Sequence, residues 1–211
     1  MKKYIYFLTL ITTFSLFSQE KINDSIQGTK QNLDEVVVQS LRVKFTAPIS
    51  HSNISKAELS SRNLGQDLPI LLSFLPSVVT TSDAGAGIGY TGIRIRGVSA
   101  QSTNITINGI PFNDPESHGT YWVNLPDFTS SIQSLQVQRG IGTSTNGSGA
   151  FGASINILTD AMSENSFAEI SNSVGSYNTR KHTVKFSTGK LNNGFELSGR
   201  LSKIDSDGYI D

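Results

Sequence analysis

The sequence contains no cysteine and carries no net charge, because 17 lysines and arginines balance 17 aspartates and glutamates in 211 residues. Without cysteine there is no disulfide framework, no thiolate nucleophile and no cysteine-ligated zinc. The balanced charge argues against a dedicated nucleic-acid binder, which would show a basic excess. Charged residues make up only 16% of the chain, which is less than in a typical soluble domain.

Long apolar runs are missing beyond the N-terminus, so the sequence predicts no membrane-spanning helix in the mature chain. Membrane β-strands stay possible, because they alternate apolar and polar residues. The N-terminus itself has a basic start at Met1–Lys3, an apolar core over residues 4–17 and a polar turn from Ser18. This three-part pattern predicts a secretory signal peptide over residues 1–18. The alternative is an anchoring or buried N-terminal helix.

A polar segment, residues 19–32, follows and is interpreted as a flexible arm. Residues 33–40 then carry three consecutive valines, which favour an extended strand. A strand directly after a loose arm is a candidate for pairing with a second protein by strand addition. The residues alone also allow an ordinary first strand of the domain.

Residues 33–160 combine helix and strand signals and predict one α+β domain. Ser55 and Glu58 form a capping box at the start of a short helix. Near Gln66, four leucines at helical spacing predict a second helix with one apolar face; they are Leu68, Leu71, Leu72 and Leu75. From residue 78 the period changes to two, and Asn108-Gly109 predicts a hairpin turn. Further strands are predicted over residues 134–139 and 154–158.

Residues 161–211 contain three predicted strands, over residues 167–174, 179–188 and 195–203. In the second strand, apolar Val184 and Phe186 alternate with a polar set, Lys181, Thr183 and Lys185. Strands of this length cross a bilayer when tilted, but three of them cannot close, and an open edge is not viable in lipid. The expectation is therefore the N-terminal piece of a larger barrel protein; a small soluble meander is the alternative.

Four separated motifs resemble, in order and spacing, the plug domain of TonB-dependent outer-membrane receptors. They are residues 93–97 (IRIRG), 107–111 (INGIP), 135–140 (LQVQRG) and 147–159 (GSGAFGASINILT). The resemblance implies an α+β plug domain followed by the first antiparallel strands of an incomplete transmembrane β-barrel, of the 22-stranded class. The sequence departs from the family pattern at Gln136, Ile141 and Ala153.

The same resemblance implies a function. The chain is expected in the outer membrane, in contact with its lipid, with the arm in the periplasm. Energy is expected from TonB and its inner-membrane energising complex, through a TonB-box-like strand: Asp34, Glu35, Val36, Val37 and Val38. The cargo expected is an extracellular small ligand such as a metal chelate, most often a ferric siderophore, with haem, cobalamin and glycans as alternatives. A soluble exported ligand-binding or interaction domain is the competing hypothesis.

Arg96 and Arg139 each end a predicted strand and precede glycine. The resemblance implies that they latch the plug to carboxylates of the barrel wall, where losing a partner would leave a costly unpaired charge. Two solvated surface arginines are the alternative.

An aromatic-rich loop after the hairpin, residues 112–122, is a plausible binding tip. Its ligand-binding candidates are Asn113, His118, Tyr121 and Trp122. Alternatively, Tyr121 and Trp122 pack against the domain core. No metal site is expected here, because Asp114, Glu116 and His118 have no second histidine nearby.

Neither cofactor nor catalysis is expected. Residues 87–92 and 147–152 both fit the pattern G-x-G-x-x-G. A dinucleotide site also needs a helix that starts within the motif, whereas strand-like residues follow both. No Ser-His-Asp or paired-carboxylate arrangement supports an enzyme, and the resemblance implies a receptor that carries out no catalysis itself.

Overall fold

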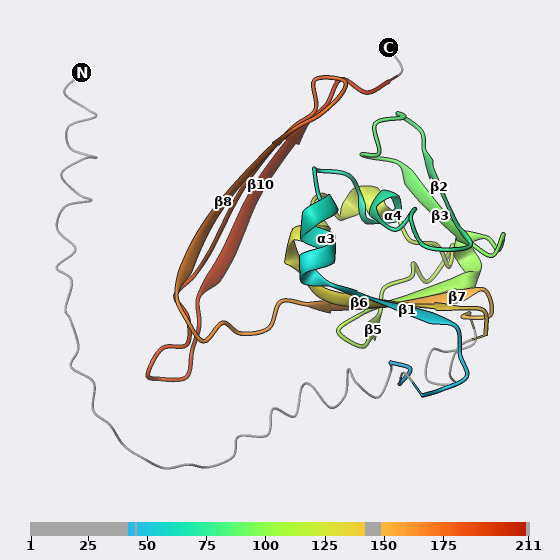
Figure 1. Cartoon of the computed structure of the whole chain (residues 1–211), viewed down its shortest axis with the longest axis horizontal. Helices are drawn as coiled ribbons and strands as arrows, with labels where there is room; N and C mark the ends of the chain where they lie inside the picture. Colours follow the sequence, from blue (N-terminus) through green and yellow to red (C-terminus); the bar gives the residue numbers. More distant parts are fainter. Residues whose placement is uncertain (1–41, 45, 142–148, 210–211) are drawn as a thin grey trace. The chain divides into compact units, whose positions relative to one another are not determined.

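The computed structural model of the chain describes residues 42–44, 46–141 and 149–209 (Figure 1). All of them belong to one of the two units into which the chain divides, Leu33–Asp211. The predicted signal peptide, the arm and the TonB-box-like strand lie outside the described residues.

The described elements are strands with short helical segments between them, followed by five consecutive strands. In chain order they are β1 (His51–Ser55), α3 (Lys56–Arg62), α4 (Leu68–Leu71), β2 (Val78–Ser82), β3 (Thr91–Ile95), η1 (Ala100–Ser102), β4 (Thr103–Ile107), β5 (Ile110–Pro111), η2 (Trp122–Asn124), η3 (Phe128–Ser131), β6 (Ile132–Arg139), β7 (Ala153–Thr159), β8 (Phe167–Val174), β9 (Arg180–Ser187) and β10 (Ser198–Asp205).

The capping box at the start of α3 is partly confirmed, since Ser55 Oγ accepts a hydrogen bond from Glu58 N at 3.3 Å. The second helix is shorter than its leucine pattern predicts, because α4 covers only four residues, with Pro69 in its first turn. Its apolar face is nevertheless present. All four predicted leucines are buried: Leu68, Leu71, Leu72 and Leu75.

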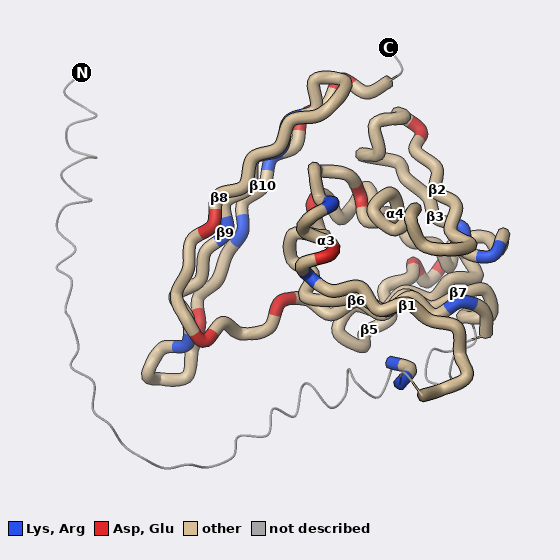
Figure 2. Tube along the Cα trace, in the orientation of Figure 1, with Lys and Arg blue, Asp and Glu red and all other residues tan. Residues whose placement is uncertain are grey.

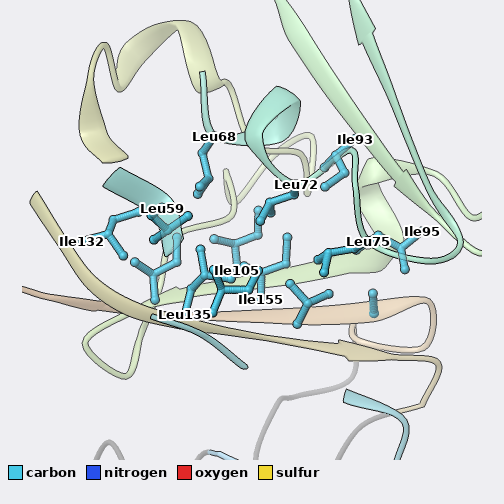
Figure 3. Close-up of a cluster of buried hydrophobic side chains, with 14 of the residues drawn as sticks. Leu59, Leu68, Leu72, Leu75, Ile93, Ile95, Ile105, Ile132, Leu135 and Ile155 are labelled. Atoms are coloured by element: carbon cyan, nitrogen blue, oxygen red, sulfur yellow. The ribbon is translucent and has the colours of Figure 1, made fainter. Parts of the chain in front are cut away.

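A five-stranded sheet of order β1-β6-β7-β4-β5 organises the first part of the chain. β4 and β7 pair in parallel, and the other neighbours are antiparallel. One face carries the apolar residues of the core cluster, including Leu135 and Ile155, against α3 and α4 (Figure 3). The opposite face is polar but also buried, with Gln136, Gln138 and Asn156 at most 3% exposed. Hydrogen bonding on that face is therefore part of the fold.

Two further sheets complete the described chain. β2 and β3 form an antiparallel hairpin, joined by a glycine-rich loop over residues 83–90 (Figure 1). β8, β9 and β10 form a three-stranded antiparallel sheet of order β10-β9-β8, with eight residues in each strand. The third strand begins three residues later than predicted, at Ser198. None of the described helices has the length and apolarity to cross a bilayer.

Candidate functional site

On β9 the buried positions all carry polar residues, and the apolar residues are exposed, the reverse of a soluble sheet. Lys181 and Thr183 are 2% and 5% exposed, whereas Val184 and Phe186 are 42% and 39% exposed. Figure 2 shows the lysines and arginines along this strand in blue. The buried polar residues contact the predicted plug domain, so the apolar face of the β8–β10 sheet points away from it.

Asp127 is the residue of the predicted plug domain on which these polar contacts converge. It lies at the N-terminus of η3, directly after Pro126, with a left-handed backbone (φ 50°). Aspartate tolerates this conformation better than most residues. The turn places the carboxylate in a buried position, with the residue 2% exposed.

Six side chains donate hydrogen bonds or ion pairs to the Asp127 carboxylate, the longest of them from Asn63 Nδ2 at 3.5 Å. Two are cations of the neighbouring sheet: Lys181 Nζ lies 2.7 Å from Oδ1, and Arg200 Nη1 lies 2.9 Å from Oδ2. Three are hydroxyls, namely Ser130 at 2.6 Å, Thr183 at 3.0 Å and Ser202 at 2.6 Å. One carboxylate thus joins η3 to both β9 and β10.

The contacts keep Asp127 ionised. Burial by itself raises the pKa of its carboxyl, but hydrogen bonds from Lys181, Ser130 and Ser202, together with the charge of Lys181, outweigh it and lower the pKa to about 2. A buried pair of this kind is strongly destabilised when only one partner is removed. The cluster is therefore a firm attachment whose strength depends on every member.

A second ionic contact lies where β7 ends. Asp160 binds Lys56 Nζ of α3 at 2.6 Å and also pairs with Lys185 of β9. Burial favours a higher pKa for Asp160, but hydrogen bonds from both lysines and their charges lower it. Asp160 is more exposed than Asp127, at 21% of its side chain, so its pairs contribute less to stability.

A cavity of about 270 Å³ lies beside Asp127, with Asp67, Ile88 and Ser202 among its lining residues. Asp67 is 4% exposed and accepts a hydrogen bond from Thr91 Oγ1 at 2.9 Å. Burial raises the pKa of Asp67 to about 6, although bonds from Thr91 and the Gly89 backbone oppose the shift. Unlike Asp127, Asp67 has no ion pair among the described residues.

Arg139, one of the two predicted latch arginines, has neutral partners in the described part of the chain. Arg139 donates to Ser52 Oγ at 2.9 Å and to Ser50 Oγ at 3.2 Å. Arg96 is exposed, has a positive φ of 55°, and lies with its guanidinium against Gly140. The two arginines are therefore brought to one region. Neither forms an ion pair within residues 42–44, 46–141 and 149–209, and their latch role stays a prediction.

The predicted binding-tip residues have different surroundings. Asn113 holds the loop together through bonds with Ile105 N, Thr103 O and His118 O, at 2.7, 2.9 and 2.9 Å. His118 is exposed, and Tyr121 is 50% exposed. Trp122 is 3% exposed and belongs to the hydrophobic core. For this residue the structure therefore agrees with the alternative, in which it packs against the core of the domain. The structure therefore leaves His118 and Tyr121 as the accessible members of the set.

Sequence reasoning missed Asp127 as a site residue. The signal available was the polar alternation of β9, which places Lys181 and Thr183 on one face. This alternation predicts a polar strand face, but it does not predict that Asp127 contacts that face. A single aspartate in a turn belongs to no periodic pattern.

Comparison with known proteins agrees with this arrangement. A family model described as "TonB-dependent Receptor Plug Domain" matches residues 43–154. The vitamin B12 transporter BtuB of Vibrio vulnificus is 28% identical over 204 residues, covering 95% of this chain and 31% of its own length. A probable TonB-dependent siderophore receptor, PirA of Acinetobacter baumannii, is 29% identical over 181 residues, covering 81% and 22% respectively.

Solved structures show the same fold. The siderophore receptor PirA from Acinetobacter baumannii has a TM-score of 0.55 and 25% identity, covering 82% of this chain and 26% of that one. The ferric enterobactin receptor PfeA from Pseudomonas aeruginosa has a TM-score of 0.59 and 22% identity, covering 81% and 26%. The chain spans less than a third of the length of these relatives. Because the family model covers more than half of the chain, the chain belongs to the TonB-dependent receptor plug domain family of the outer membrane, with a plug followed by the first antiparallel strands of the barrel.

Proposed function

We propose that the protein takes up a scarce ligand, a ferric siderophore or another iron complex, by TonB-coupled active transport across the outer membrane. The matched relatives are named as transporters and receptors for vitamin B12 and siderophores. The names of two relatives from different organisms specify a siderophore or ferric enterobactin, which favours iron over cobalamin as the cargo.

The observation that carries the proposal is the attachment of the plug to β9 and β10 through Asp127. A plug that moves during transport needs contacts that are firm yet able to break and re-form. Hydrogen bonds and ion pairs meet this requirement, because water can replace each of them when the surfaces separate. The exposed apolar face of the same sheet favours a membrane-embedded strand over the soluble alternative.

We propose for individual residues the roles that the sequence predicts. Asp34–Val38 are proposed to pair with TonB by strand addition. Arg96 and Arg139 are proposed to meet wall carboxylates. For the ligand, exposed His118 and Tyr121 are the favoured contacts, with Asn113 holding their loop.

An uptake assay tests the proposal. A strain lacking the receptor gene is complemented with the full-length gene, and uptake of radiolabelled ferric siderophores and of labelled cobalamin is measured with and without TonB. TonB-dependent uptake of an iron complex supports the proposal. Uptake of cobalamin alone contradicts the iron assignment, and uptake that does not need TonB contradicts the coupling.

A further inference from the structure

Val43 is docked on the plug by a side chain rather than by a neighbouring strand. Gln136 Oε1 accepts a hydrogen bond from Val43 N at 2.8 Å, and Gln136 Nε2 donates one to Val43 O at 3.0 Å. Both residues are buried, with 6% of Val43 and 1% of Gln136 exposed. The side-chain amide thus exchanges the pair of bonds that a residue of an antiparallel strand would exchange with Val43.

The second donor and the second acceptor position of the Gln136 amide form hydrogen bonds within the sheet. Nε2 also donates to Asn53 Oδ1 at 2.7 Å, and Oε1 also accepts from Gln138 Nε2 at 2.9 Å. Two donors and two acceptors are therefore satisfied, which fixes the orientation of the amide. A carboxylate at this position could not donate to Val43 O. The glutamine amide can both donate to Val43 O and accept from Val43 N.

The chain on either side of Val43 is held differently. Arg42 donates to Ser134 Oγ at 2.9 Å, to Ser134 O at 3.0 Å and to Asn156 O at 3.3 Å. β1 begins at His51 and pairs with β6 over five residues. Side-chain bonds thus hold residues 42 and 43, whereas a backbone ladder holds β1. A pull on the chain before Arg42 loads the side-chain bonds first.

We propose that Gln136 is a positioning residue that docks the start of the plug, and that the Val43–Gln136 contact opens before the β1–β6 ladder when the N-terminal arm is pulled. The inference rests on the proposed function, with TonB paired to Asp34–Val38 and pulling on the chain before Arg42. Opening breaks the Arg42 bonds to Ser134 and Asn156, breaks two neutral hydrogen bonds to Gln136 and exposes one valine. It frees residues 43–49, which span at most roughly 25 Å when extended, while the sheet and the bond from Arg139 N to Ser50 O stay intact.

Single-molecule pulling on the full receptor in a bilayer tests the order of opening. We would pull the N-terminus of three receptors: the wild type, the Gln136→Leu variant and the Gln133→Leu variant. Leucine at 136 keeps the volume but removes both bonds, and Gln133 is an exposed glutamine of the same strand. The wild type and Gln133→Leu should show an early step of at most roughly 25 Å before the plug unfolds. Gln136→Leu should show this step at a lower force, because only the Arg42 bonds then hold the segment. A wild type without the step, or a step at unchanged force in Gln136→Leu, overturns the proposal.

A spin label separates local undocking from general loosening. Residues 1–211 contain no cysteine, so Lys44→Cys gives one labelling site within them, beside the contact. In Gln136→Leu this label should tumble roughly threefold faster, while a label at Glu58→Cys on α3 keeps its wild-type mobility. Equal mobilisation at both sites would show a general structural role and overturn the proposal. Both measurements need neither ligand nor TonB, so failure of the transport proposal would be seen separately, as missing uptake by the wild type.

Discussion

Asp127 of the plug and Lys181 of β9 form an ion pair of 2.7 Å in which the two side chains are 1% and 2% exposed. Burial of both charges makes the pair dependent on its geometry, because each charge has lost its hydration. Arg200 approaches the other carboxylate oxygen at 2.9 Å. A single plug residue thus faces cations from two adjacent strands of the wall.

Asp127→Asn should weaken the attachment of the plug. Removing one partner of a buried pair costs roughly 3–5 kcal/mol, since the other charge stays buried and unpaired. The expected result is faster hydrogen exchange of plug amides and greater entry of large antibiotics at normal receptor levels. Asp83→Asn, at an exposed position of the β2–β3 loop, is the matched control. Equal antibiotic entry for both variants would contradict the attachment role.

Asp67 should make plug stability depend on pH. Its pKa is raised from 3.8 to about 6 in the fold, so the folded state binds more protons between these values. Stability therefore falls as pH rises from about 4 to about 6 and then levels off. Asp67→Asn should remove this slope and stabilise the plug at pH 7 by roughly 1–3 kcal/mol. Hydrogen exchange of α4 amides measured across this pH range checks it, and an unchanged slope in the variant counts against it.

Local features of the fold were predictable from the sequence. The Asn108-Gly109 hairpin joins β4 to β5, and both turn residues have positive φ, 51° and 83°. This geometry is what the dipeptide favours. The leucine face near α4 was likewise predictable from spacing alone. Both are determined by residues close together in the chain.

Long-range pairings were not predictable in the same way. β4 pairs in parallel with β7, which lies some fifty residues further along the chain. The sequence of neither strand indicates which strand it pairs with. The Gln136 contact with Val43 spans 93 positions, and Asp127 with Arg200 spans 73. Such contacts depend on the whole topology, so single residues in turns and on polar strand faces acquire roles that no local pattern encodes.

Gly152 should be intolerant of any side chain. A Cβ there would lie 2.7 Å from Val98 Cγ1 and 2.8 Å from the Ser102 carbonyl oxygen, which is closer than real contacts allow. Gly152→Ala should destabilise the plug by roughly 1–3 kcal/mol through overpacking, seen as less receptor in the membrane. Gly149→Ala is the control, because a Cβ there meets nothing within 4 Å. Equal losses in both variants would contradict the packing explanation.

Arg96→Ala combined with Arg139→Ala should loosen the plug without unfolding the barrel. If these arginines meet carboxylates of the wall, the expected signature is increased entry of large antibiotics at normal surface levels of receptor. Arg139 also bonds Ser50 and Ser52 of the plug, so Ser52→Ala serves as a control for that local contact. Unchanged permeability in the double variant would count against the latch.

Transport coupling through residues 34–38 is tested most directly by proline at Val37. Strand addition depends on backbone N–H donors, and proline removes one and fixes φ. The account predicts that Val37→Pro abolishes TonB-dependent uptake of the labelled iron complex while surface binding persists, and that Val37→Ala, which keeps the donor, is much milder. Full uptake by Val37→Pro cells, or loss of surface binding together with uptake, would contradict it.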